Sequence, residues 1–287
     1  MIVNRKTEHS STGNVPAEHH ESCVAIFGAG VMGETLLSGL LRAGRSADRL
    51  VITERRPERV AELTERYVGV RILDNVEAAD LADIIVLVVK PQDMAALLAE
   101  ISDHVRPGNI VVSLAAGITT SFLEQHLPDG ASVVRVMPNT PALVDQGMAA
   151  LSSGRHCLPE HMEQAVALLR SCGRTVEVPE QYQDAVTAIS GSGPAYVFYV
   201  IEAMIEAGVV LGLPRATATE LVVQTLFGAA TMIRETGQHP TVLREQVTSP
   251  GGTTAAALRQ LDDHKVRAAF ITAMEAAAAR SAELSKQ

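Results

Sequence analysis

Three glycines with the spacing G-x-G-x-x-G are the residues of this sequence that most clearly indicate chemistry. Gly28, Gly30 and Gly33 directly follow the apolar run CVAIF and precede a helix-like stretch. In such a strand–turn–helix unit the first glycine permits a tight turn, the second lets the backbone approach a pyrophosphate, and the third lets the helix pack on the strand. The N-terminus of the helix adds partial positive charge. Residues 28–33 therefore predict a dinucleotide-binding site.

The residues after the second apolar run bear on the choice of dinucleotide. Glu54 follows Gly33 by about 20 residues, where an acid would bind the free ribose 2′-hydroxyl of NADH. Arg55 and Arg56 come next; they could pair with the 2′-phosphate of NADPH, or could be solvated residues at the start of a helix. Both interpretations stay open. Because two arginines outnumber one acid, the sequence favours NADPH, with NADH as the alternative.

A second segment, TSPGGTT at residues 248–254, predicts an anion site. Gly251 and Gly252 free the backbone to turn its N–H groups toward a ligand, and the hydroxyls of Ser249, Thr253 and Thr254 lie beside them. The following AAALRQL favours a helix, whose N-terminus attracts anions. Plain capping is the alternative, because Ser and Thr commonly cap helices. The two glycines favour binding of a small carboxylate.

Other loops are expected at the carboxyl ends of strands or before helices, and open α/β folds bind ligands at those strand ends. They are VVKP with Lys90, SLAAG ending at Gly117, MPNTP with Asn139, and SGSGP at residues 190–194. A cofactor-facing role and a plain surface position are both open for Lys90. None of these loops supplies a His, Asp, Glu or Cys for a general base, which alcohol oxidation normally requires. A protonated imine would accept a hydride without such a base, because its carbon is already electrophilic.

The order of apolar runs predicts the fold. Up to about residue 178, amphipathic stretches separate the runs CVAIF, LVIT, VRIL, DIIVLVV, NIVVSL, SVVRVM, MAAL and TVEV. This alternation predicts an α/β Rossmann domain with a mostly parallel, doubly wound sheet. Beyond about residue 180 the apolar residues recur at helical spacing, with a break near Asp262. We expect a flexible tail at residues 1–20, a dinucleotide-binding domain at 21–180 and an all-α domain at 181–287.

The helical half is expected to form a subunit interface. The stretch from Pro194 to Leu213 is apolar nearly all round, with Glu202 and Glu206 as its charges. A helix of that kind must be covered on most sides, and about 105 residues of helix do not easily cover it within one chain. Oligomerisation is therefore favoured over an intrachain core.

Composition argues against several classes of function. The 24 Lys and Arg against 33 Asp and Glu give a net charge of −9, which disfavours nucleic acid as a partner. The longest uncharged stretches have about 17 residues, short of the roughly 20 needed for a membrane span. The polar N-terminus is not a signal peptide, so a cytoplasmic protein is expected. Cys23, Cys157 and Cys172 suit small buried apolar positions, and their spacing predicts neither a disulfide framework nor a metal site.

Six segments together resemble the pyrroline-5-carboxylate reductase family. They are FGAGVMG, VVKPQ, AAG, MPNTP, DAVTAISGSGPAY and VTSPGGTTAAAL, in that order, and the last two are specific to this family. The resemblance extends from about Cys23 to the C-terminus. It implies reduction of 1-pyrroline-5-carboxylate to L-proline, the last step of proline biosynthesis, with hydride passing from C4 of the nicotinamide to C5 of the imine.

The resemblance also implies an assembly and a set of site residues. Members are dimers through the helical domain and commonly form decamers, and the cofactor of one subunit meets the helical domain of its partner. Ser249, Gly251, Gly252, Thr253 and Thr254 would hold the substrate, with the Thr254 hydroxyl at its nitrogen as the catalytic group. The residues expected to hold the cofactor are Gly28, Ala29, Gly30, Val31, Met32, Gly33, Arg55, Arg56, Asn75, Val88, Val89, Lys90, Pro91, Ala115, Ala116, Gly117 and Asn139. Many members carry small hydroxyl residues where this sequence has Glu54-Arg55-Arg56.

Two other functions compete with this one. A β-hydroxyacid dehydrogenase shares the Rossmann-plus-helices plan, but its relatives use a lysine in the helical domain, and here only Lys265 and Lys286 lie in that half. A non-catalytic dinucleotide sensor would need no substrate loop. The TSPGGTT segment argues against the sensor.

Overall fold

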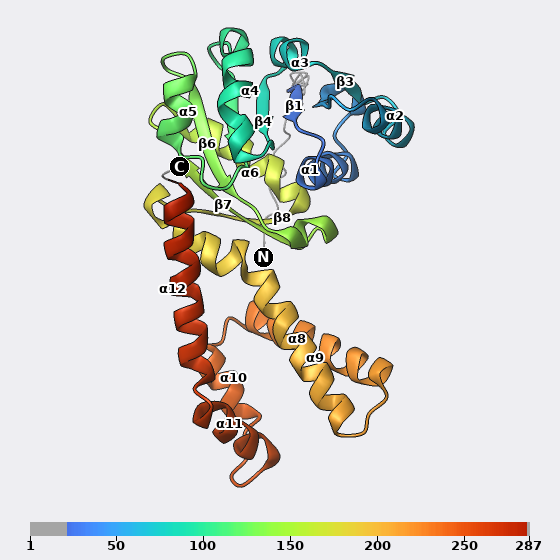
Figure 1. Cartoon of the computed structure of the whole chain (residues 1–287), viewed down its shortest axis with the longest axis vertical. Coiled ribbons are helices and arrows are strands. Elements are labelled where there is room, and N and C mark those ends of the chain that lie inside the picture. Colours follow the sequence, from blue (N-terminus) through green and yellow to red (C-terminus); the bar gives the residue numbers. More distant parts are fainter. Residues whose placement is uncertain (1–21, 286–287) are drawn as a thin grey trace, which may run out of the picture.

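Eight strands form one sheet at the upper end of the molecule (Figure 1). The computed structural model describes residues 22–285, so the tail expected at residues 1–20 lies outside the described residues. The strands are β1 (Val24–Phe27), β2 (Leu50–Thr53), β3 (Arg71–Leu73), β4 (Ile84–Leu87), β5 (Ile110–Ser113), β6 (Ser132–Met137), β7 (Gly147–Ser153) and β8 (Gly173–Glu177). Every apolar run in the first half of the sequence thus contributes a strand.

The sheet has the order β3-β2-β1-β4-β5-β6-β7-β8. All neighbouring pairs are parallel except β6 and β7, which are antiparallel. The order reverses between β1 and β4, and this reversal creates a crevice at the carboxyl ends of the two strands, where doubly wound folds bind ligands. The predicted α/β class and mostly parallel sheet are confirmed.

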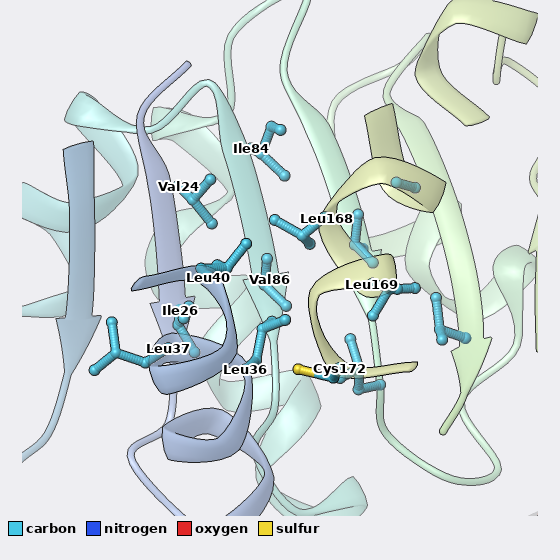
Figure 2. Packing of buried hydrophobic residues seen from close by; sticks show 14 of the residues in the cluster. Val24, Ile26, Leu36, Leu37, Leu40, Ile84, Val86, Leu168, Leu169 and Cys172 are labelled. Carbon is cyan, nitrogen blue, oxygen red and sulfur yellow. The ribbon is translucent and has the colours of Figure 1, made fainter. Parts of the chain in front are cut away.

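Helices cover both faces of this sheet. They are α1 (Val31–Arg42), α2 (Pro57–Arg66), α3 (Asn75–Leu81), α4 (Met94–Ile101), α5 (Thr120–His126) and α6 (Pro159–Leu169). On one face Ile26 and Val86 pack with Leu36 of α1, Leu168 of α6 and Cys172 (Figure 2). The opposite face is covered by α3, α4 and α5 through a second apolar cluster. The central strands β1 and β4 are therefore buried throughout.

The second half is helical, as the sequence predicts. It contains α7 (Gln183–Val186), a π-helical turn (Thr187–Gly191), α8 (Gly193–Val210), α9 (Arg215–Thr236), α10 (Pro240–Gln246), α11 (Thr253–Asp263) and α12 (Val266–Leu284). The expected break after Asp262 is present, because Lys265 adopts φ of 57° between α11 and α12. The short α10 carries too little periodicity to be found in the sequence. SGSGP at residues 190–194 is not a loop but part of the helical run through the π turn into α8.

The helices α8 and α9 expose much of their apolar surface. In one chain α8 buries none of its residues, and α9 buries only Ala218 and Val222. Phe198 is 63% exposed and Phe227 is 62% exposed. Figure 1 shows the α8–α9 pair and the α10–α12 helices projecting from the sheet domain as separate arms. Such a surface marks an interface rather than a finished core.

By length and composition, two of these helices could also cross a membrane. The continuous run Glu180–Val210 has a mean hydropathy of 1.3 in its most apolar window, and Arg215–Thr236 has 1.2. The expectation of no membrane span rested on uncharged stretches alone, and a helix tolerates one or two carboxylates within an apolar length. Length and composition therefore do not exclude a span, and the absence of one stays a prediction.

Candidate functional site

A cleft of about 320 Å³ lies at the carboxyl edge of the sheet, beside the point where the strand order reverses. Five of the residues predicted to bind a cofactor line it: Gly28, Ala29, Arg55, Asn75 and Val89. They come from the turns after β1, β2 and β4 and from the start of α3, so the topology brings together four segments that are distant in sequence. The remaining lining residues are Thr53, Glu54, Asp93, Ala96 and Leu97. Around Asp93, Ala96 and Leu97 the sequence shows only ordinary helix amphipathicity, which does not indicate a binding site.

The glycine turn has the shape that a pyrophosphate requires. Gly28 adopts φ of +112°, and a Cβ on Gly33 would lie 2.0 Å from the Gly28 carbonyl oxygen. A Cβ on Gly30, in contrast, would meet no atom within 4 Å, so this side of the turn is open. No side chain caps α1, and its first backbone hydrogen bond runs from the Glu34 N–H to the Gly30 carbonyl. The backbone N–H groups before Glu34, including those of Val31 and Met32, make no helical hydrogen bond and can bind an anion. The turn therefore fits a dinucleotide.

Glu54 lines the cleft and accepts hydrogen bonds from its own loop. Its carboxylate accepts the backbone N–H groups of Arg55 at 2.8 Å and Arg56 at 3.0 Å, and the Arg56 guanidinium at 2.9 Å. The Arg56 side chain is the main cause that lowers the pKa of Glu54 to about 2. The expected ribose-binding role of Glu54 stays a prediction: Glu54 lines the cleft, but a ribose hydroxyl would share its carboxylate with these donors of the loop.

The two arginines are exposed but paired. The Arg56 side chain, 69% exposed, bonds Glu54, whereas Arg55, 77% exposed, bonds Glu100 of α4 at 2.6 Å. The same Glu100 oxygen accepts the side-chain amide of Asn75 at 2.9 Å. Both interpretations of the arginines therefore stay open, because each is exposed to solvent and also bonded to a carboxylate. Glu100 is a site residue that the sequence does not reveal, since it resembles any surface glutamate on an amphipathic helix.

The other predicted cofactor residues lie at the same sheet edge but outside the lining of this cleft. Val88 is half-buried beneath Gly28, and Lys90 and Pro91 are exposed at the start of a short 3-10 turn (Pro91–Asp93). The segment from Ala115 to Gly117 follows β5, where Ala115 is buried. Their contact with a cofactor stays a prediction.

Asn139 links the two halves of the chain. Its side-chain amide donates to the Ser190 carbonyl at 3.1 Å, and its side-chain oxygen accepts the Met148 N–H at 2.8 Å. It also lines an open, mainly apolar pocket with residues of α8 and α12. These contacts give it a structural role, and its contact with the cofactor stays a prediction.

The TSPGGTT segment forms a tight turn at the N-terminus of α11. The Gly252 N–H bonds the Ser249 carbonyl at 3.0 Å, Gly251 adopts φ of +69°, and Gly252 is the N-cap residue. Since no side chain caps α11, simple capping by Ser or Thr is not the role of this loop. The first-turn N–H groups, with the half-buried Thr254, are left to bind an anion.

This turn and the cleft lie far apart within one chain. Figure 1 shows α10 and α11 at the end of the molecule most distant from the sheet, connected to it by the long α12. A ligand in the cleft of one chain cannot therefore touch Thr254 of the same chain. A site that contained both the cleft and this turn would need a second copy of the chain.

A metal centre and a reactive thiol are two other kinds of site that residues 22–285 could contain. Within this range no three His, Cys, Asp or Glu side chains gather where they could hold a metal. Cys23 and Cys172 are buried, as expected, while Cys157 is half-buried and burial raises its pKa to about 11. The thiols therefore lack the lowered pKa of a nucleophile.

The comparisons with known proteins agree with this architecture. Residues 180–284 match the family model of pyrroline-5-carboxylate reductase dimerisation, and residues 23–117 match that of coenzyme F420-dependent NADP oxidoreductases. The pyrroline-5-carboxylate reductase of Corynebacterium melassecola is 48% identical over 92% of this chain and 98% of that protein. The structure of the reductase from Coxiella burnetii has a TM-score of 0.88 at 37% identity, covering 93% of this chain and 99% of that one. The Plasmodium falciparum pyrroline carboxylate reductase, with NADP bound, has a TM-score of 0.81 at 30% identity, covering 92% and 98%. This chain belongs to the pyrroline-5-carboxylate reductase family.

Proposed function

We propose that this protein reduces 1-pyrroline-5-carboxylate to L-proline with a reduced nicotinamide dinucleotide. The observation that carries the proposal is the likeness to the Corynebacterium reductase over nearly the full length of both chains. The site supports it independently, because a dinucleotide cleft and an uncharged anion-binding turn suit a small cyclic acid better than an alcohol. Lys265, which is the one lysine in residues 181–285, is the N-cap residue of α12 and does not support a β-hydroxyacid dehydrogenase.

The chemistry divides between cofactor and protein. When bound, a reduced nicotinamide would supply a hydride to C5 of the protonated imine, so that the C=N bond would become a single bond and the nitrogen would regain its lone pair. The N–H groups of Gly251, Thr253 and Thr254 would bind the substrate carboxylate, since that of Gly252 already bonds Ser249, and the Thr254 hydroxyl would orient the ring nitrogen. Because no charged side chain is needed, positioning and fixed dipoles contribute most of the catalysis.

The active site is proposed to form between two subunits. The distance between the cleft and the α11 turn within one chain supports this arrangement, as does the exposed apolar surface of α8 and α9. The match of residues 180–284 to a dimerisation domain covers both apolar helices, so a partner chain, rather than lipid, is proposed to cover them. Assembly of such dimers into a decamer and a cytoplasmic location complete the proposal.

NADPH is the proposed cofactor, with NADH as an alternative. The NADP bound to the Plasmodium relative supports NADPH, and so do two exposed arginines at the rim of the cleft. Each arginine has a carboxylate partner, however, and the strength of the preference depends on how readily these pairs open.

A direct assay tests the proposal. The purified protein is mixed with pyrroline-5-carboxylate and NADPH, loss of the reduced nicotinamide absorbance is followed, and proline is identified as the product. Activity is expected with the wild-type chain. A protein that binds the dinucleotide but reduces no imine would be a sensor instead, and the proposal would be wrong.

A further inference from the structure

One carboxylate oxygen of Glu100 is the meeting point of two donors at the rim of the cofactor cleft. Arg55 Nη2 lies 2.6 Å from Glu100 Oε2, and Asn75 Nδ2 lies 2.9 Å from the same atom. The three side chains come from different elements: the turn after β2, the first residue of α3 and the body of α4. Asn75 is only 7% exposed, so its amide is held in place rather than free to follow solvent. A fixed amide and a guanidinium that converge on one oxygen form an anion-binding arrangement.

The other charges near this point are mainly negative. A rim pocket adjoins the cofactor cleft and shares Thr53, Glu54, Arg55 and Asn75 with it. Its lining contains one arginine, Arg55, and the carboxylates Glu54, Asp74, Glu77 and Glu100. Arg56 does not offset this charge freely, because its guanidinium is bonded to Glu54. A phosphate that binds here would therefore meet two arginines that already have carboxylate partners: Arg55 is bonded to Glu100 and Arg56 to Glu54.

The pair of Arg55 and Glu100 lies near the place where the ribose of the cofactor is expected. Thr53, Glu54 and Arg55 follow β2, where the ribose 2′ group lies in dinucleotide-binding folds. A 2′-phosphate there would take its hydrogen bonds from Arg55 and Asn75, the two groups that Glu100 holds. A 2′-hydroxyl, by contrast, can donate a hydrogen bond to the Glu100 carboxylate without displacing it.

We propose that Glu100 is a specificity-determining residue for the cofactor, because its carboxylate occupies the position in which Arg55 and Asn75 would hold a 2′-phosphate. It weakens the advantage that the arginines give to NADPH and lets the protein use NADH as well. The proposal rests on the proposed function only in requiring that a nicotinamide dinucleotide binds in the cleft. The Glu100 side chain is 37% exposed, so it can turn into solvent when a phosphate displaces it, at the cost of its two hydrogen bonds.

The test compares Glu100→Gln with wild type, using kcat/KM for NADPH and for NADH. Glutamine removes the charge and can turn its own amide toward a phosphate. We expect the ratio of kcat/KM for NADPH to that for NADH to rise roughly five- to thirtyfold, the effect of removing one negative charge a few ångströms from a phosphate at a partly exposed site. The increase should come from KM for NADPH rather than from kcat.

Two further variants test whether the effect belongs to Glu100 itself. Glu77→Gln removes a charge from the same rim pocket, but Glu77 bonds neither Arg55 nor Asn75. It should change the cofactor ratio much less than Glu100→Gln. Arg55→Gln should shift the ratio in the opposite direction, toward NADH. An equal shift in Glu77→Gln and Glu100→Gln would overturn the proposal, since it would reflect the general field of the pocket.

A binding measurement separates this proposal from the proposed function. Adenosine 2′-monophosphate and adenosine 5′-monophosphate are titrated into the full chain by calorimetry, with no imine present. Glu100→Gln should bind the 2′-phosphate more tightly and the 5′-phosphate as wild type does. Unchanged or weaker binding of the 2′-phosphate would refute the role of Glu100, whatever the activity. If Glu100→Gln fails to fold, tighter or unchanged binding of the 2′-phosphate by Arg55→Gln refutes it equally.

Discussion

Alanine at Gly30 and alanine at Gly33 should separate cofactor binding from folding. Both residues belong to the turn between β1 and α1, but they have different surroundings. A Cβ on Gly30 meets nothing within 4 Å, and the residue's φ of −72° suits alanine. A Cβ on Gly33 lies 2.0 Å from the backbone oxygen of Gly28, and no side-chain rotation can relieve that contact. The first substitution therefore fills only the space expected for a pyrophosphate, whereas the second must move the chain.

The magnitudes follow from these contacts. For Gly30→Ala, alanine is a poorer N-cap than glycine, but the loss is largely offset by the smaller entropy of the unfolded chain, so stability changes by less than about 1 kcal/mol. Its affinity for the dinucleotide should fall tenfold or more, about 1.4 kcal/mol or above. Gly33→Ala should destabilise the protein by roughly 1–3 kcal/mol, as expected for overpacking against a rigid neighbour.

Two measurements distinguish the variants. Thermal unfolding is followed at one fixed protein concentration, because assembly makes the midpoint concentration-dependent. Binding of NADPH is followed by the fluorescence of its reduced nicotinamide, which is convenient because the chain has no tryptophan. If Gly30→Ala binds NADPH with the wild-type affinity, the pyrophosphate does not pass over Gly30, and the assignment of the cleft is refuted.

Three other predictions concern the remaining parts of the site. Thr254→Ala should lower kcat roughly ten- to a hundredfold with little change in NADPH binding, and Thr254→Ser should restore most of the rate; an unaffected rate in Thr254→Ala would remove its hydroxyl from the mechanism. Phe227→Asp should give a monomer by sedimentation that binds NADPH but reduces no imine; an active monomer would contradict the shared site. Glu54→Gln should lower the free energy of unfolding by about 1–2 kcal/mol at pH 7, less than the full pKa shift implies because Arg56 is solvated. Since the pKa of Glu54 is lowered from 4.5 to about 2, its contribution is complete above pH 4.5 and fades as the pH falls toward 2, so urea titrations should show the variant and wild type converging there.

The regular parts of the fold follow from local sequence patterns. A strand buried on both faces must be apolar throughout, and β4 with its sequence IIVL can hardly be anything else. The glycine turn is equally local, because its geometry depends on residues within one strand, one turn and one helix. Both were therefore predictable without knowledge of the rest of the chain.

The pairing of charges at the cleft was not predictable in the same way. Glu54 and Arg56 are close in sequence, yet whether the carboxylate faces a ribose or its own loop depends on the backbone N–H groups that the turn presents. The contact between Arg55 and Glu100 joins residues that are far apart in sequence, so it depends on how α4 packs against the sheet. The sequence after β2 shows two arginines and one acid, but Glu100 is a second acid, which pairs with Arg55. Less positive charge is therefore available to a cofactor phosphate than the local sequence suggests.

The lack of charge in the proposed substrate turn is consistent with its position at the end of a separate arm. In the proposed dimer the N-terminus of α11 would be open to water before two subunits meet and would face the cofactor of the partner afterwards. A carboxylate or ammonium group on this turn would lose its hydration in the assembled site and would need a partner of opposite charge there. Backbone N–H groups and a threonine hydroxyl carry only partial charges, so they can be buried against a substrate carboxylate at lower cost. The same absence of charge that excludes a general base thus makes this turn suitable for transfer across a subunit interface.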